Sequence, residues 1–391
     1  MDGLDEPGGA VPDVSGSLWP RDEAFAAVVG EWGEDPAADY RRASMPASTR
    51  AAYAGDWDRF TRWCAQTNAE PLPAAPGVVS RYLAAAADLI DEAGAPAYAT
   101  ATLTRWVAGI NAAHRAAGLP APGADPLVTE TLRGIRATRA QPPRRAKPLR
   151  LAQLEAVLAG VETRYWPGAV IGRRDRALLL LGFAGALRRS ELAALQIRDV
   201  ELDADGVVTV RIRMSKTDQD ATGQTVAYPR GTTRANCTAC AVLDWAVILG
   251  AWTDGARVAV LQTLTVARTK DPSRHACTDP DAREAWAQMG ERDPYGPLLR
   301  PVTKAATITP RPISGATVAG VVRTRLADAG IDPTGYSGHS LRAGFVTDAF
   351  TAGATAHEIM RQTRHTSPAT LEAYARHYAP LDANAVTKIG L

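Results

Sequence analysis

The sequence has little of the features that define two whole classes of protein. It holds four cysteines in 391 residues, too few and too scattered for a disulfide framework in a chain of this size. No stretch approaches the ~18 to 20 uncharged apolar residues that cross a bilayer, and the acidic beginning lacks the basic-then-apolar order of a secretory signal. We therefore expect a cytoplasmic protein without a membrane partner.

Charge is small in sum but unevenly distributed. The formal net charge is +2, yet residues 1–36 hold nine acidic side chains and one basic one, so the remaining residues carry +10. Between residues 131 and 150 there are seven basic side chains and no acidic one. A basic body fits a polyanion such as nucleic acid, although a solvated charged linker would explain the same run.

Periodicity and proline positions divide the chain into four parts. Residues 1–36, rich in Gly, Pro, Asp and Glu, indicate a flexible acidic tail. Residues 37–140 predict an all-helical domain, because apolar side chains recur there at three- and four-residue spacing. Residues 141–149 contain three prolines and predict a basic linker. Residues 150–391 predict a second domain that is mainly helical with a small β-hairpin, so the fold class is mainly α with a minor β component (α+β).

The elements expected along the chain are mostly helices. They cover residues 48–63 with Ser48 as N-cap, then 76–87, 99–117, 126–139, 150–160 and 174–184, then a segment that starts at Cys240 and most of the final 75 residues. Strands are expected over residues 207–213 and 224–228, joined by a polar turn. Residues 251–300, with their Gly, Pro and charge, are expected to be irregular.

Four short segments of the second domain carry side chains suited to chemistry. They are GALRRSEL at 185–192, SKT at 215–217, GHSLRAGF at 338–345 and RHT at 364–366. The last is followed by Ser-Pro, a favourable start for a helix that bears Tyr374. Singly, each segment has an ordinary explanation: a capping arginine, a solvated lysine or a packed tyrosine.

The order of these segments resembles the tyrosine recombinase (phage integrase) family. That pattern is GxLRxSEL, a hairpin lysine, HxLRxGF, and a histidine nine residues before a tyrosine, and the resemblance covers about residues 40–391. It implies a helical core-binding domain and a catalytic domain that form a clamp around double-stranded DNA. It also implies a homotetramer on specific recombination sites and a 3′-phosphotyrosyl intermediate, formed without ATP, metal or another cofactor.

The resemblance assigns roles to five residues of the pocket. Arg188 and Arg342 would hold the scissile phosphate, since a guanidinium donates two hydrogen bonds to phosphate oxygens. His339 and His365 would complete the cradle and assist proton movement. Glu191, three residues after Arg188, would orient the pocket from behind.

Tyr374 would be the nucleophile and Lys216 would protonate the departing 5′ hydroxyl. A phenol with a pKa near 10 needs a cationic pocket to stabilise its phenolate. Tyr378 is a rival, because it lies four residues later and would share a helix face with Tyr374. The nine-residue spacing from His365 favours Tyr374.

Contacts with DNA outside the pocket are expected from basic side chains of the helical domain and the linker. The candidates are Arg50, Arg59, Arg62, Arg105, Arg115, Arg144, Arg145 and Lys147. Phosphate contacts commonly outnumber base contacts, so most of these would position rather than specify. Solvated surface arginines are the alternative explanation for each.

Two other functions and one metal site remain open at this point. A type IB topoisomerase-like enzyme uses a similar residue set, and a DNA-binding regulator could keep the fold without the chemistry. Cys237 and Cys240 form a CxxC that His275 and Cys277 could complete as four zinc ligands. Because HxC is an uncommon second half and the intervening loop is long, we expect reduced, packed thiols and no metal ion.

Overall fold

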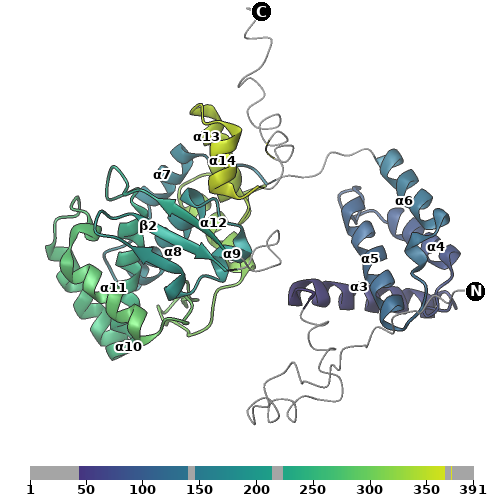
Figure 1. Cartoon of the computed structure of the whole chain (residues 1–391), viewed down its shortest axis with the longest axis horizontal. Helices are drawn as coiled ribbons and strands as arrows, with labels where there is room; N and C mark the ends of the chain where they lie inside the picture. Colours follow the sequence, from purple (N-terminus) through teal and green to yellow (C-terminus); the bar gives the residue numbers. More distant parts are fainter. Residues whose placement is uncertain (1–43, 140–145, 214–222, 366–370, 372–391) are drawn as a thin grey trace, which may run out of the picture. The chain divides into compact units, whose positions relative to one another are not determined.

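A computed structural model describes residues 44–139, 146–213, 223–365 and 371 (Figure 1). The predictions for the acidic tail, for Arg144, Arg145 and Lys216, and for Tyr374 and Tyr378 lie outside these ranges. The chain divides into two compact units, residues 1–143 and 144–391, and each has its own hydrophobic core.

The described part of the first unit is helical, as predicted. Its helices are α3 (Ala47–Gln66), α4 (Pro76–Ala87), α5 (Thr100–Ala116) and α6 (Pro126–Arg139), with a short 3-10 turn η1 (Pro122–Ala124) before α6. The core is aromatic: the ring of Tyr82 lies 5.2 Å from Phe60 and 5.4 Å from Trp106. The prediction that Ser48 caps the first helix is wrong. Helix α3 begins one residue earlier, after Pro46, whose ring fixes φ at the N-cap.

The second unit packs its helices around a three-stranded antiparallel sheet and a central helix, α8. The sheet has the order β1 (Val200–Leu202), β2 (Val208–Ile212) and β3 (Gln224–Tyr228), with Val210 opposite both Val200 and Val226. The helices are α7 (Leu151–Ala159), α8 (Gly168–Ala184), α9 (Arg189–Ala193), α10 (Thr238–Thr269), α11 (Pro280–Arg292), α12 (Gly315–Asp328), α13 (Ser340–Thr351) and α14 (Ala356–Thr363). Two 3-10 turns, η2 (Ile197–Asp199) and η3 (Ala276–Thr278), complete it.

Residues 251–300 are not irregular, contrary to the prediction. They contain the second half of α10, then η3 and α11. The sequence pattern did not reveal the second half of α10, because the helix is broken at Gly255 and Ala256, whose backbone angles are not helical. Strand β1, with three residues, was missed because it is too short to show alternation.

Among the described helices, α10 has the length and hydropathy of a helix that could cross a membrane. More than half of its most apolar window is buried within the unit, as in the core helix of a soluble protein. The break at Gly255 also leaves no straight run of the ~20 residues that a bilayer requires.

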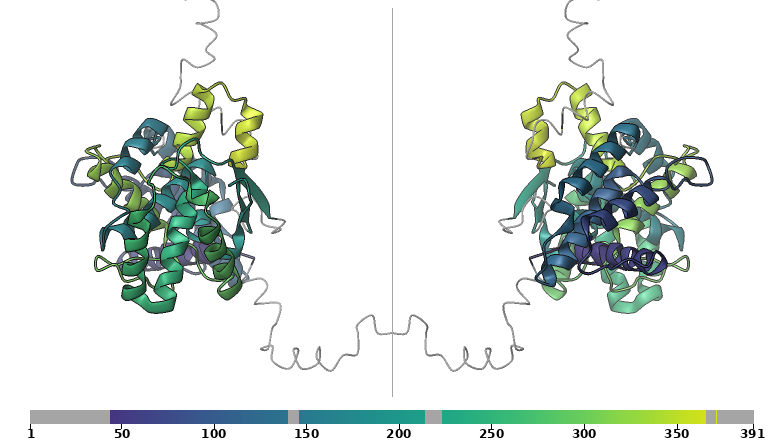
Figure 2. Two further views of the ribbon diagram at one scale, coloured as in Figure 1. Left: turned by 90° about the vertical axis from the view of Figure 1, so that its left-hand side faces the viewer. Right: turned by 90° about the vertical axis from the view of Figure 1, so that its right-hand side faces the viewer.

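Helices α10 and α11 lie at the opposite end of this unit from α13 and α14 (Figure 1, Figure 2).

The end of the linker is bonded to the segment that precedes α13. The backbone N–H of Lys147 donates to Gly335 O, and that of Leu149 donates to Ser340 O, both at 2.9 Å. Gly344 of α13 allows this approach, because a Cβ there would stand 1.8 Å from the carbonyl oxygen of Leu149. The glycine of HSLRAGF therefore has a packing role.

Candidate active site

Arg188 and Glu191 are joined at the start of α9, directly after the buried helix α8 ends. Arg188 is the N-cap residue, and its backbone N–H donates to Glu191 Oε2 at 2.9 Å. Its guanidinium Nη1 donates to Glu191 Oε1 at 2.7 Å. The short helix thus fixes both the backbone and the side chain of Arg188, which stays partly open to solvent.

Arg364 is a member of the pocket that the sequence analysis missed. Its Nη2 donates to Glu191 Oε2 at 2.7 Å, and both side chains are only 3% exposed. The residue ends α14 in the left-handed region (φ 58°), a conformation that is costly for a non-glycine residue and that turns the chain into the pocket. The sequence placed Arg364 beside His365 but carried no signal of its burial against a residue 173 positions away.

Arg342 enters the same pocket from α13 and is 1% exposed. Its Nη1 donates to the carbonyl oxygen of Ala186 at 2.7 Å. Ala186 also has a positive φ, 44°, so two strained residues, Ala186 and Arg364, lie at this one place. Such strain concentrates at functional sites because the surrounding packing must over-determine it.

His339 and His365 are both held in the neutral form. The pKa of His365 falls to about 3, first because the ring is partly buried and then because Arg342 and Arg188 oppose another positive charge. The side chain of His339 is exposed on the open side of the pocket. Its pKa is still lowered, by desolvation from the neighbouring protein and by Arg342 and Arg188.

Thr363 fixes the orientation of His365. The Thr363 hydroxyl donates to Ile359 O at 2.7 Å, so its oxygen accepts from Nδ1–H of His365 at 2.8 Å. This network assigns the proton of the neutral ring to Nδ1 and leaves Nε2 as the acceptor.

The described pocket is positively charged overall. It holds three guanidinium groups, those of Arg188, Arg342 and Arg364, and one carboxylate, that of Glu191, which binds Arg188 and Arg364. Because both histidines are neutral, two positive charges remain uncompensated among these side chains. An anion with several oxygens is the ligand that such a cradle of donors favours.

Lys216 and Tyr374 were predicted for this site and lie outside the described residues. Leu371, three residues before Tyr374, is described: it is fully buried against Val346 of α13 and Ile359 of α14. Leu371 is therefore packed on α13, which carries Arg342, and on α14, which ends at Arg364.

The predicted DNA-contacting arginines of the first unit differ in what they contact. Arg105 pairs with the buried carboxylate of Asp56 through two hydrogen bonds, so it has a part in the fold. Arg59 stacks over the rings of Tyr98 and Trp106. Of the other three, Arg62 pairs with Asp58 on the surface, Arg50 donates to Met45 O, and Arg115 is open to solvent. All five arginines are exposed. Lys147 is also exposed and lies over the ring of Tyr336.

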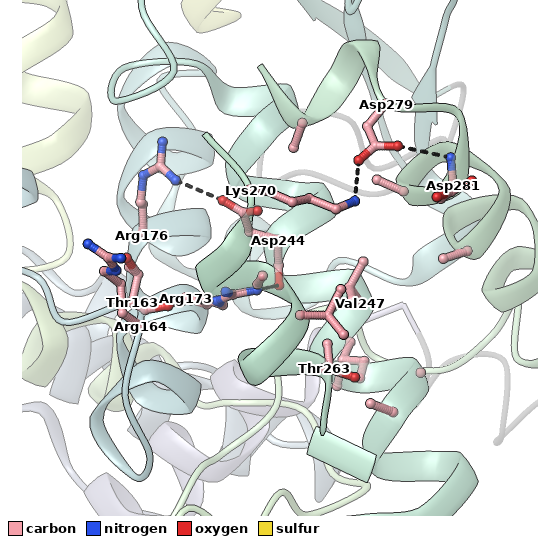
Figure 3. A pocket seen from close by; sticks show the side chains of 18 of the residues that line it. Thr163, Arg164, Arg173, Arg176, Asp244, Val247, Thr263, Lys270, Asp279 and Asp281 are labelled. Carbon is pink, nitrogen blue, oxygen red and sulfur yellow. Dashed lines mark hydrogen bonds and ion pairs between the residues drawn. The ribbon is translucent and has the colours of Figure 1, made fainter. Parts of the chain in front are cut away.

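A cavity of about 1300 Å³ lies elsewhere in the second unit (Figure 3). Its wall includes Arg173 and Arg176 of α8 and Asp244 of α10, with Arg176 and Arg234 paired to Asp244. Its lining residues include none of the six described members of the arginine pocket. The cavity is therefore separate from the candidate active site.

Comparison with curated proteins identifies related chains, although no family model matches the sequence. An integrase/recombinase xerD homolog from Selenomonas ruminantium is 30% identical over 345 residues, which cover 88% of this chain and 85% of that protein. The tyrosine recombinase XerD of Ralstonia nicotianae is 40% identical over 84 residues, covering 22% and 26% of the two chains.

Solved structures of similar proteins were also found. The XerA recombinase is 16% identical, with 90% of this chain and 96% of that chain covered and a TM-score of 0.35. A DNA-bound lambda integrase dimer is 15% identical, with 90% and 93% covered and a TM-score of 0.44. The extent of the Selenomonas match, together with the arginine and histidine pocket, shows that this chain belongs to the tyrosine recombinase/integrase family, the enzymes that cleave and rejoin DNA.

Proposed function

We propose that this enzyme is a site-specific recombinase that exchanges DNA strands through a covalent bond between Tyr374 and a 3′ phosphate. The observation that carries the proposal is the pocket in which Arg188 and Arg364 both bind Glu191, and Arg342 lies close to two neutral histidines. A phosphodiester under attack gathers negative charge on its non-bridging oxygens, and fixed donors directed at that charge are typically the largest catalytic contribution.

In the proposed reaction, Arg188 and Arg342 bind the non-bridging oxygens of the scissile phosphate. The phenolic oxygen of Tyr374 attacks phosphorus and its proton passes to solvent with the help of the pocket histidines. The bond to the 5′ oxygen breaks, and Lys216 protonates the departing 5′ oxygen to give the hydroxyl. Rejoining is the reverse: a 5′ hydroxyl attacks the phosphotyrosyl bond and releases the phenol. The energy of the phosphodiester is kept in the intermediate, so the reaction needs neither ATP nor a catalytic metal ion.

Glu191 and Arg364 do not contact the phosphate in this scheme but position the arginine that does. Glu191 accepts from both Arg188 and Arg364, so it fixes the direction of the Arg188 fork. His339 and His365 gain a negative neighbour when the phosphate binds, which raises the pKa of both rings. We therefore expect DNA binding to be coupled to proton uptake, which makes each ring a better hydrogen-bond donor to the phosphate.

The test is covalent capture of DNA on a nicked substrate. The probe is duplex DNA from the flanks of the enzyme's own gene, nicked so that the cleaved strand diffuses away and the adduct accumulates. Tyr374→Phe is expected to abolish the adduct and leave DNA binding unchanged, whereas the matched variant Tyr378→Phe keeps both. Adducts that persist in Tyr374→Phe and vanish in Tyr378→Phe would refute the assignment.

We further propose that the active form is a homotetramer on two paired sites, in the cytoplasm where DNA is accessible. Residues 379–391 would dock on a neighbouring subunit through Ala383, Val386 and Ile389, which recur every three residues and lie outside the described residues. Truncation after Pro380 should leave binding of one site intact and weaken pairing of two. Relaxation of supercoiled DNA without such a pair of sites would instead favour a topoisomerase-like activity.

Basic side chains outside the pocket are proposed to contact DNA phosphates. In the first unit these are Arg50, Arg62, Arg115 and the stacked Arg59, and along the linker they are Arg144, Arg145 and Lys147. Arg105 is proposed to contact DNA while it also pairs with Asp56 in the fold. Log affinity falls as log salt concentration rises, and each lost phosphate contact should make this slope less steep by about 0.9. Arg115→Gln is the clearest variant, because this side chain is open to solvent. An unchanged slope would remove Arg115 from the DNA interface.

A further inference from the structure

Four side chains that the reaction does not use meet in the second unit. Cys237 is the N-cap residue of α10, and Cys240 lies in its first turn. His275 and Cys277 come from η3, which follows α10 in the chain. The three thiols are buried and the imidazole is half-buried, and their ligand atoms all lie within 4.8 Å of one another.

Four of the six separations between the ligand atoms are close to the edges of a zinc tetrahedron, and the other two are no longer than 4.8 Å. Tetrahedral zinc with Zn–S bonds of ~2.3 Å and Zn–N bonds of ~2.0 to 2.1 Å places two sulfur ligands about 3.8 Å apart and a sulfur and a nitrogen about 3.6 Å apart. Here the Sγ of Cys277 lies 4.0 Å from that of Cys237 and 3.7 Å from that of Cys240. Nδ1 of His275 lies 3.4 Å from the Sγ of Cys240 and 3.8 Å from that of Cys277.

Disulfides and simple packing explain this arrangement less well. A disulfide requires sulfur atoms ~2.0 Å apart, and all four described cysteines are free. Packed thiols have no reason to gather an imidazole nitrogen at the same point.

We propose that Cys237, Cys240, His275 and Cys277 bind one Zn²⁺ ion in a closed, four-coordinate structural site. Three thiolates, one neutral imidazole and the ion carry a charge of −1, and the guanidinium of Arg230 is close enough to Cys277 to act on it electrostatically. Sulfur-rich tetrahedral ligand sets select zinc over the harder divalent cations. His275 also lines the cavity of Figure 3, which gives the ion a path from solvent.

The ion would tie the beginning of α10 to the turn that follows its end. Ligands 40 residues apart would then close the loop of chain that contains both halves of α10. Gly206, in the turn between β1 and β2, lies so close that a Cβ there would stand 3.0 Å from Cys277 Sγ. With four protein ligands no position is left for a reacting water, so the site organises the fold and takes no part in strand cleavage.

The experiment measures metal in the purified full-length protein. We expect one zinc per chain by elemental mass spectrometry, released in step with titration of the thiols by a mercurial reagent. Exchange with Co²⁺ should give the intense visible absorption of tetrahedral cobalt thiolate. Cys240→Ser and His275→Ala should lose at least about tenfold in metal affinity, whereas His275→Cys, which keeps a fourth ligand, should retain the ion.

Cys64→Ser is the matched control, because Cys64 is a buried free cysteine of the first unit. This variant should keep one zinc per chain. Wild-type protein that holds no stoichiometric zinc and takes up no Co²⁺ under reducing conditions would overturn the proposal. So would full zinc content in both Cys240→Ser and His275→Ala. The wild-type measurement decides the matter even if a variant fails to fold.

Discussion

The second unit contains two clusters of polar side chains that are opposite in kind. The arginine pocket (Arg188, Glu191, His339, Arg342, Arg364 and His365) holds fixed positive charges in excess of its one carboxylate. The cysteine–histidine cluster (Cys237, Cys240, His275 and Cys277) holds three thiols that become anionic ligands when a cation is present, together with one neutral imidazole.

The two clusters also differ in access. The arginine pocket keeps an open side, since His339 is exposed and Arg188 is partly so. The three thiols of the cysteine–histidine cluster are buried. A site whose ligand must arrive and leave needs an opening, whereas a site for a resident ion is better closed. The comparison thus separates the part of the unit that binds substrate from the part that stabilises the fold.

Metal removal should have the largest effect, and it should act on one cluster alone. Structural zinc sites contribute about 10 to 16 kcal/mol of apparent binding free energy in small domains at pH 7, which is comparable to the whole stability of a domain, about 5 to 15 kcal/mol. A strong chelator with a reductant should therefore sharply lower the thermal midpoint of the second unit, measured by calorimetry. An unchanged thermal midpoint after chelation would contradict the view that the cysteine–histidine cluster stabilises the fold through a bound ion.

Glu191→Gln should have the next largest effect and should act on the arginine pocket. It removes the carboxylate shared by Arg188 and the buried Arg364, and loss of one partner of a buried pair costs about 3 to 5 kcal/mol. The free energy of unfolding from urea titration measures it. Asp58→Asn, which breaks an ion pair whose side chains are 68% and 64% exposed, should cost less than about 1 kcal/mol. Equal losses in the two variants would contradict the view that Glu191 organises the pocket.

Arg342→Lys should lower the rate of strand cleavage by about 10² to 10³, because one fixed donor to the phosphate is lost while the charge is kept. DNA affinity should change little, since the remaining guanidinium groups still attract the phosphate. Single-turnover cleavage of the nicked substrate measures the rate. Arg323→Lys, at an exposed position of α12, is the control and should cleave like the wild type. Normal cleavage by Arg342→Lys would exclude a role for the guanidinium fork.

His365 should give the smallest effect at neutral pH and a larger one in acid. Its pKa is about 3 in the folded protein, chiefly because of burial and then because of Arg342 and Arg188, while an unfolded chain has a histidine pKa near 6.5. The stability that His365 contributes is therefore present above pH 6.5 and is lost as the pH falls from about 6.5 toward 3. Comparison of urea unfolding of the wild type and His365→Asn between pH 4 and 8 should show a shallower acid slope in the variant. Identical slopes would mean that the ring titrates normally.

Local sequence patterns predicted most helices of the first unit and the order of several helices and strands in the second. Helix α4 and strand β3 have the predicted bounds, because proline, apolar period and strand alternation act within a few residues. The start of helix α10 was predicted, but its second half was taken as irregular, because the break at Gly255 interrupts the helical periodicity.

The candidate site was predictable only where a sequence pattern marks it. Arg188, His339, Arg342 and His365 stand in recognisable motifs, and the structure brings all four into one pocket. Arg364 lies in the segment RHT but was given no role, since its role follows from a left-handed backbone and from contact with Glu191. Contacts between positions so far apart in the chain are set by packing, which local patterns do not encode.

The backbone hydrogen bonds at the end of the linker connect it to the start of helix α13, which carries Arg342. Lys147 is bonded to Gly335 and Leu149 to Ser340, and Ser340 directly follows His339. One of these two bonds is made by Leu149, a residue of the hydrophobic core, so the end of the linker is anchored in the core and to the chain next to His339 at once. A displacement of residues 147–149 would therefore act on the start of α13, the helix that carries Arg342.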